Sequence, residues 1–232
     1  MSAVTPHRPM DPAVIVAQSR EDVVSGNEIV RHNRASRLIH WAVAICFFVA
    51  LLTGMPIWTP VFGWMAHLFG GLSVCRVLHP WAGVAFFTAS VAMFFQWASD
   101  MHLEVAERDW LGPRAIQYMR YQTDDSQVGK YNGGQKLYFW AVSVGAVGLL
   151  LSGLLMWFPR AFPPLAKKLA YLIHDFTFIC FAVSLVFHVY LGTAAEPGTF
   201  RSMIRGTVTK AWARLHHPRW FREVTGEETR RT

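Results

Sequence analysis

Residues 38–74 read LIHWAVAICFFVALLTGMPIWTPVFGWMAHLFGGLSV and contain no Lys, Arg, Asp or Glu. Three more stretches, 77–99, 137–159 and 169–195, are similarly apolar, and only the last holds a charged residue, Asp175. A transmembrane helix needs roughly 20 predominantly apolar residues, and each of the four stretches supplies them. The sequence therefore predicts an all-α integral membrane protein built as a four-helix bundle.

Proline and glycine divide the first stretch into a helix and an external segment. Pro56, Pro60 and the pair Gly70–Gly71 mark this division, because both residue types interrupt regular helices. Residues 61–72 then form an apolar loop or a short helix in the membrane interface. The four predicted membrane helices are 36–58, 76–97, 135–158 and 168–192.

The distribution of charge orients these helices. The chain has 232 residues, of which 16% are charged, with a net charge of +7, whereas a soluble domain carries about 25% charged residues. Basic residues gather before the first helix, between the second and third, and after the fourth. By the positive-inside rule, both termini and the middle loop lie in the cytoplasm of a bacterium, around its inner membrane. Because these charges flank membrane spans, they argue against nucleic-acid binding.

This pattern divides the chain into three regions. Residues 1–30 are polar and predict a flexible cytoplasmic arm, residues 31–195 the membrane domain, and residues 196–232 a cytoplasmic tail. The three cysteines form no CxxC or CxxCH motif. A zinc ribbon and covalently attached c-type haem are therefore not expected.

Four histidines fall inside the predicted helices: His40, His79, His174 and His188. Ionisable residues are costly in a membrane, so each is a functional candidate. Fourteen residues separate His174 from His188, which places them roughly 21 Å apart and about 40° apart around one helix. They share one face of the fourth helix at two depths.

Depth in the membrane pairs the four histidines. His79 and His174 lie near the periplasmic side, and His40 and His188 lie near the cytoplasmic side. Two stacked haems b, each with two histidine ligands and held between helices 1, 2 and 4, fit this arrangement, because bis-histidine ligation suits electron transfer. Proton relay or hydrogen-bonded packing remains the alternative for any single histidine.

Several motifs resemble the cytochrome b (gamma) subunit of membrane-bound respiratory formate dehydrogenases. They cover most of the chain from Ile29 to Glu223, and the most specific are VGKYNGGQK from Val128 and WARLHHPRWFRE from Trp212. The others are RLIHW around His40, CRVLHP around His79, LIH ending at His174 and HVY from His188.

The resemblance implies that the four histidines ligate two haems b in the pairs given above. It also implies a quinone site beside the cytoplasmic haem, formed by Asn132, Gly134 and Gln135. Asn and Gln side chains can hydrogen-bond a quinone carbonyl. From the residues alone, an N–G turn that caps a helix is the preferred explanation of Asn132 and Gln135.

The resemblance further implies the complex in which the chain works. An iron–sulfur (beta) subunit and a molybdenum- or tungsten-containing catalytic (alpha) subunit oxidise formate, and electrons cross the membrane to reduce menaquinone or ubiquinone on the cytoplasmic side. Whether this heterotrimer forms a higher oligomer stays open. The alternatives are the cytochrome b subunit of a nickel–iron hydrogenase, a non-redox membrane anchor and a proton-conducting transporter.

Overall fold

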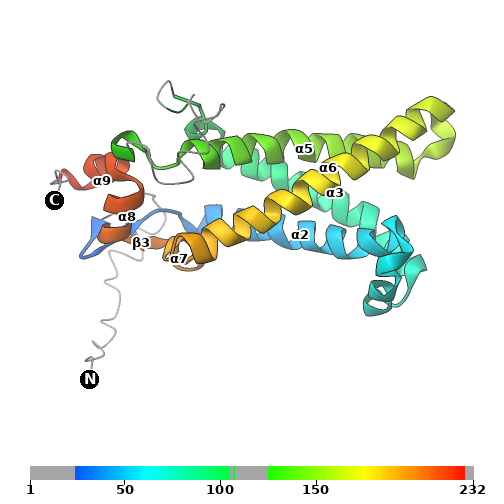
Figure 1. Ribbon diagram of the computed structural model, residues 1–232, viewed down its shortest axis with the longest axis horizontal. Coiled ribbons are helices and arrows are strands. Elements are labelled where there is room, and N and C mark those ends of the chain that lie inside the picture. Colours follow the sequence, from blue (N-terminus) through cyan, green and yellow to red (C-terminus); the bar gives the residue numbers. More distant parts are fainter. Residues whose placement is uncertain (1–23, 105–106, 108–124, 228–232) are drawn as a thin grey trace. The chain divides into compact units, whose positions relative to one another are not determined.

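Four long helices dominate the computed structural model, which describes residues 24–104, 107 and 125–227. Each is long and apolar enough to cross a membrane, and Figure 1 shows them as a bundle. The predicted four-span helical architecture is confirmed. The helices are α2 (Arg34–Trp58), α3 (Leu72–Trp97), α5 (Gly133–Trp157) and α6 (Pro164–Tyr190).

The helix ends differ from the prediction where local capping decides them. Helix α6 begins at Pro164 rather than 168, because proline suits the first turn of a helix, whose N–H groups have no intrahelical partner. Helix α3 begins at Leu72, directly after Gly71. Beyond Tyr190 the chain continues as a π-helix, η6 (Leu191–Ala195).

The external segment between α2 and α3 is a 3-10 helix, η1 (Pro60–Phe69). The Thr59 side chain accepts a hydrogen bond from the Val61 N–H and so caps it. Met65 and Ala66 are buried, whereas Trp64 is exposed. Shorter 3-10 turns complete the description: η2 (Ala98–Asp100), η4 (Asp125–Gln127) and η5 (Pro159–Ala161).

Helix α5 packs closely against both α3 and α6, whereas α2 makes few close backbone approaches to the other spans among the described residues. A layer of phenylalanines joins α2 to the rest. The ring centre of Phe47 lies 5.4 Å from that of Phe86 and 5.6 Å from that of Phe181, and the last two lie 5.8 Å apart. Val142 and Ala146 of α5 complete this buried cluster.

The chain divides into two compact units. The described residues of 38–124 and 131–196 form the membrane unit. Those of 1–37, 125–130 and 197–232 form the second, which we call the tail unit. Its sheet has the order β1-β2-β3 and is antiparallel throughout. The strands are β1 (Val24–Ser25), β2 (Glu28–Val30) and β3 (Thr207–Thr209), and the helices are α7 (Thr199–Arg205), α8 (Lys210–His216) and α9 (Pro218–Thr225).

The sequence did not predict this sheet. Residues 24–30, at the end of the expected arm, form β1 and β2, and the rest of that arm lies outside the described residues. Register pairs Ile29 with Val208, and both side chains are buried in the core of the tail unit. The region boundaries expected at residues 30 and 196 stay predictions.

Arg31 is buried at the centre of the tail unit, with 2% of its surface exposed. Its guanidinium carbon lies 4.7 Å from the Trp212 ring centre and 5.7 Å from that of Trp220. Its Nη2 donates to the Lys130 carbonyl at 2.7 Å. The cation is thus paired with aromatic faces and a main-chain acceptor, which offsets the cost of burying it.

Segment 126–130 is held through its main-chain carbonyls. His217 Nδ1 donates to the Gly129 carbonyl at 2.7 Å, the Arg219 N–H to that of Val128 at 3.1 Å, and Arg222 Nη2 to that of Ser126 at 2.8 Å. Burial, and next the nearby Arg31 charge, hold the pKa of His217 well below its usual value of 6.5. A neutral His217 leaves Nδ1 as the donor to Gly129.

Candidate functional site: two histidine pairs and a capped helix

The first histidine pair consists of His40 on α2 and His188 on α6. Their ring centres lie 6.2 Å apart, and the ring planes are inclined by 42°. The Tyr138 ring of α5 stacks on His188, with ring centres 4.7 Å apart and planes within 8°. Nδ1 of His40 is buried and has no hydrogen-bond partner among the described residues.

The second pair consists of His79 on α3 and His174 on α6. Their ring centres lie 6.1 Å apart, with the planes inclined by 73°. Nδ1 of His79 lies 2.9 Å from the Ala50 carbonyl of α2, and Nδ1 of His174 lies 2.9 Å from Oγ of Ser152 of α5. The structure therefore brings together the two histidines of each pair that the sequence predicted.

Two glycines face the second pair, and only Gly54 is needed for space there. A Cβ at Gly54 would stand 2.8 Å from Cε1 of His79, closer than side chains tolerate, and a Cβ at Gly153 would stand 3.5 Å from Cε1 of His174. A Cβ at Gly83, which follows His79 by one turn of α3, would meet nothing within 4 Å. A side chain at position 54 would push the His79 ring aside.

Asn132 and Gln135 form a capping box at the start of α5. Oδ1 of Asn132 accepts from the Gln135 N–H at 2.9 Å, and Oε1 of Gln135 accepts from the Asn132 N–H at 3.1 Å. The side-chain oxygen of each amide thus accepts a hydrogen bond from the backbone at the start of the helix. Both NH₂ groups remain as donors, and no hydrogen bond from either occurs among the described residues.

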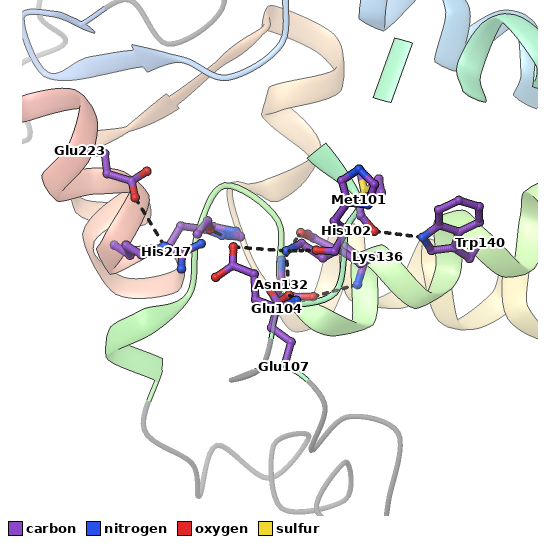
Figure 2. A network of polar contacts seen from close by, with 12 residues as sticks. Met101, His102, Glu104, Glu107, Asn132, Lys136, Trp140, His217 and Glu223 are labelled. Carbon is purple, nitrogen blue, oxygen red and sulfur yellow. Dashed lines mark hydrogen bonds and ion pairs between the residues drawn. The ribbon is translucent and has the colours of Figure 1, made fainter. Parts of the chain in front are cut away.

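Lys136, the next residue, is 4% exposed and lies among polar partners (Figure 2). Its Nζ donates to the Glu107 carboxylate at 2.7 Å and to the His102 carbonyl at 3.0 Å, and lies 3.8 Å from Glu104. These contacts tie the first turn of α5 to the segment that follows α3. Trp140 adds a hydrogen bond to the Met101 carbonyl at 2.9 Å.

Comparison with known proteins decides the family. Residues 31–206 match the family of prokaryotic cytochrome b561. The chain belongs to the prokaryotic cytochrome b561 family. In Escherichia coli K12, the cytochrome b556(fdo) subunit of formate dehydrogenase is 35% identical over 202 residues, which cover 84% of this chain and 93% of the relative.

Two further relatives of this cytochrome b carry similar names. The nitrate-inducible formate dehydrogenase cytochrome b556(Fdn) subunit of E. coli K12 is 32% identical over 206 residues, covering 88% of this chain and 94% of the relative. The formate dehydrogenase cytochrome b556 subunit of Haemophilus influenzae is 30% identical over 211 residues, covering 88% and 87%. The resemblance stated from the sequence motifs is confirmed.

Membership in this family implies haem b, and the histidine pairs fit such a group. With metal–nitrogen bonds of roughly 2 Å on each side, two imidazoles that share one iron have ring centres about 6 Å apart. The observed separations are 6.2 and 6.1 Å. Nδ1 of His40 is buried without a hydrogen-bond partner among the described residues, and Gly54 lets the His79 ring approach α2 closely.

Sequence reasoning missed three residues of this site. Ser152 lies within an apolar helix and was not predicted as a site residue, although a polar side chain inside a membrane span indicates a functional role. Tyr138 lies near the start of an apolar helix, where aromatic residues are common, and its stacking on His188 has no signal in the sequence. Lys136 lies at the border of an apolar stretch. Its role was not predicted, because its partners Glu104 and Glu107 lie far from it in the sequence.

Proposed function

We propose that this chain is the di-haem cytochrome b subunit of a respiratory formate dehydrogenase. It carries electrons from a periplasmic iron–sulfur subunit across the inner membrane to a quinone on the cytoplasmic side. The single observation behind this proposal is the separation of about 6 Å within both histidine pairs. The names of the relatives support the formate dehydrogenase assignment. The further partner that we propose is a molybdenum- or tungsten-containing catalytic subunit.

In the proposed site, His79 and His174 would hold one haem, and His40 and His188 would hold the other. When bound, haem b would supply a reversible one-electron change at its iron. Two histidines on each iron would leave no position for another ligand. Tyr138 fixes the His188 ring by stacking, and the Ala50 carbonyl orients His79.

The tail unit supports the orientation that we propose. Strand β2 precedes the first span and β3 follows the fourth, yet the two strands pair. Paired strands lie on one side of a membrane, so the number of crossings between them is even. Segment 125–130 belongs to the same unit. All three segments are those that the positive-inside rule assigns to the cytoplasm.

We assign the quinone site to Asn132, Gly134 and Gln135. The capping box supports this role, because it turns both side-chain NH₂ groups away from the backbone that the oxygens cap. A quinone carbonyl accepts such donors, and a glycine at position 134 lets the ring approach the main chain.

The first experiment is a reduced-minus-oxidised spectrum of the purified chain, with haem quantified per polypeptide. Two non-covalent b haems per chain are expected. Replacing either member of a pair by alanine should remove one haem and leave the other. No haem in a folded preparation would favour the anchor or transporter, and loss of both haems from every variant would contradict the pairing.

The quinone assignment is tested with variants that keep the cap. Asn132→Ser keeps a side-chain acceptor for the Gln135 N–H, and Gln135→Glu keeps the acceptor for the Asn132 N–H, but both lose the NH₂ donor. Quinone reductase activity should fall more than tenfold while both haems remain. Normal activity in both variants would overturn the assignment. Asn132→Ala, which loses cap and donor together, shows what capping adds.

A hydrogenase partner is the second candidate. We propose formate as the electron donor, and reduction of the haems by formate in the purified complex tests this assignment. A complex that reduces its haems with hydrogen and not with formate would decide for the hydrogenase.

A further inference from the structure

Ser152 of α5 connects the backbone of its own helix to the ring of His174. Its Oγ lies 2.6 Å from the Gly148 carbonyl oxygen and 2.9 Å from Nδ1 of His174. A carbonyl oxygen can only accept, so the hydroxyl donates its proton to Gly148. Oγ then accepts from His174, whose ring also has a backbone hydrogen bond to Leu149, and Nδ1 carries the hydrogen of that ring. The other nitrogen, Nε2, keeps its lone pair for a metal.

The geometry at His79 has the same consequence. Its Nδ1 lies 2.9 Å from the Ala50 carbonyl oxygen, which can only accept. Both rings of this pair therefore donate through Nδ1, and both have Nε2 free as a ligand. Metal-binding histidines in proteins usually have such a partner on the second ring nitrogen.

The other pair is built differently. Nδ1 of His40 is buried without a hydrogen-bond partner among the described residues. His188 is held by stacking on Tyr138, not by a hydrogen bond that the structure records. The two pairs thus differ in the hydrogen bonding of their rings, although their ring separations are nearly equal.

We propose that Ser152 is a positioning residue that lowers the reduction potential of the haem held by His79 and His174, the outer haem, below that of the inner haem held by His40 and His188. This inference rests on the proposed function. A ring that donates its second N–H becomes a more basic ligand. A more basic ligand stabilises the ferric state, and hydrogen bonding around the ligands is one of the means by which proteins set haem potentials.

This order of reduction potentials determines the direction in which electron transfer is favourable. An electron that arrives at the outer pair moves to a site of higher potential when it passes to the inner pair. Ser152 and the Ala50 carbonyl therefore favour inward transfer, toward the proposed quinone residues. The α2 and α5 helices supply these two groups through ordinary helical geometry.

The test is Ser152→Ala in the full-length protein, with both haems titrated against potential and followed by their absorbance. The outer haem should become easier to reduce by about tenfold, which corresponds to 59 mV for a one-electron couple. The inner haem should not move. The low-spin ferric signals in electron paramagnetic resonance provide a second readout, in which only the outer haem should change.

Matched variants separate positioning from packing. Ser143 lies on the same helix and donates to the Phe139 carbonyl at 2.8 Å, but it has no recorded contact with a predicted ligand. Ser143→Ala should leave both potentials unchanged. Ser152→Thr retains the hydroxyl and should restore the potential of the original protein. A His79→Ala variant, which lacks the outer haem, identifies which step of the titration belongs to which haem.

The failures are distinguishable. If two haems bind but Ser152→Ala leaves the outer potential unchanged, or shifts the inner one instead, the positioning role is wrong and the proposed function stands. If the original chain binds no haem, the proposed function itself fails. If the alanine variant loses haem, Ser152→Cys is measured instead, because a thiol accepts a hydrogen bond more weakly than a hydroxyl does. An intermediate rise then supports the proposal, and no rise overturns it.

Discussion

Gly54 of α2 faces the imidazole of His79 of α3 so closely that a methyl group at position 54 would stand 2.8 Å from Cε1 and 3.0 Å from Nδ1 of that ring. The ring cannot retreat without losing its hydrogen bond to the Ala50 carbonyl. Gly54→Ala should therefore displace His79 and halve the haem content, as measured by the reduced-minus-oxidised spectrum.

Gly63→Ala is the control for this prediction. A Cβ at Gly63 of η1 meets nothing within 4 Å, so this variant should keep both haems. Full haem content in Gly54→Ala would show that the glycine is not needed for space beside His79.

Lys136→Met removes the cation that faces a buried carboxylate. The side chains of Lys136 and Glu107 are only 5% and 12% exposed. Breaking a buried pair by removing one partner costs about 3 kcal/mol, because the remaining charge is left uncompensated. We expect a lower melting temperature for the detergent-solubilised protein.

Lys210→Met is the matched control, since Lys210 pairs with Glu227 at 3.1 Å with both side chains partly exposed. Exposed pairs contribute roughly 0–1 kcal/mol, so its melting temperature should change little. Equal effects of the two variants would contradict the importance of burial at Lys136.

His217 should make stability depend on pH in a defined window. Burial lowers the pKa of His217 well below 6.5, so the folded protein keeps it neutral where the unfolded chain takes up a proton. This residue has no effect on stability above pH 6.5. Below that value the free energy of unfolding falls by about 1.4 kcal/mol per pH unit.

Denaturation of the solubilised protein between pH 7.5 and 5.5 measures this slope. His217→Gln should reduce it, and His67→Gln, at an exposed position on η1, should not. An unchanged slope in His217→Gln would assign the pH dependence to other groups.

Arg31→Lys tests the aromatic stack in the tail unit. Lysine keeps the charge but loses the planar group that lies over Trp212 and reaches the Lys130 carbonyl. A desolvated cation–π contact is worth about 2 kcal/mol, so trypsin should cleave the tail unit faster. Arg214→Lys, at a half-exposed side chain over Phe221, should have little effect. Equal cleavage rates in both variants would argue against the stack.

The four spans could be predicted from local sequence, and the pairing of their histidines from the depth at which each span places its histidine. Absence of charge marks the helices, and fourteen-residue spacing places His174 and His188 on one face. Phe181 lies midway between them, at a position whose packing against Phe47 and Phe86 depends on three helices. These ring contacts between helices were not predictable from a single sequence.

The two most specific sequence motifs have a physical explanation that only the structure provides. The HHPRW and VGKYNGGQK segments meet, because His217 binds the Gly129 carbonyl and the Arg219 N–H binds that of Val128. The interactions run through main-chain carbonyls, which carry no side-chain signature. Likewise, the sequence alone does not show that the side-chain oxygens of Asn132 and Gln135 cap the helix, while their NH₂ groups make no hydrogen bond within the described part of the chain.

The central strand of the tail unit also has a consequence for biosynthesis. Strand β2 leaves the ribosome before any span, but its partner β3 is made only after α6. Arg31 is also translated early, and its contacts with the Trp212 and Trp220 rings can form only after the tail has been translated. The sheet therefore closes last, after all four helices have been inserted. A polypeptide truncated before residue 207 leaves β2 with an unpaired edge, which can pair with other chains and promote aggregation.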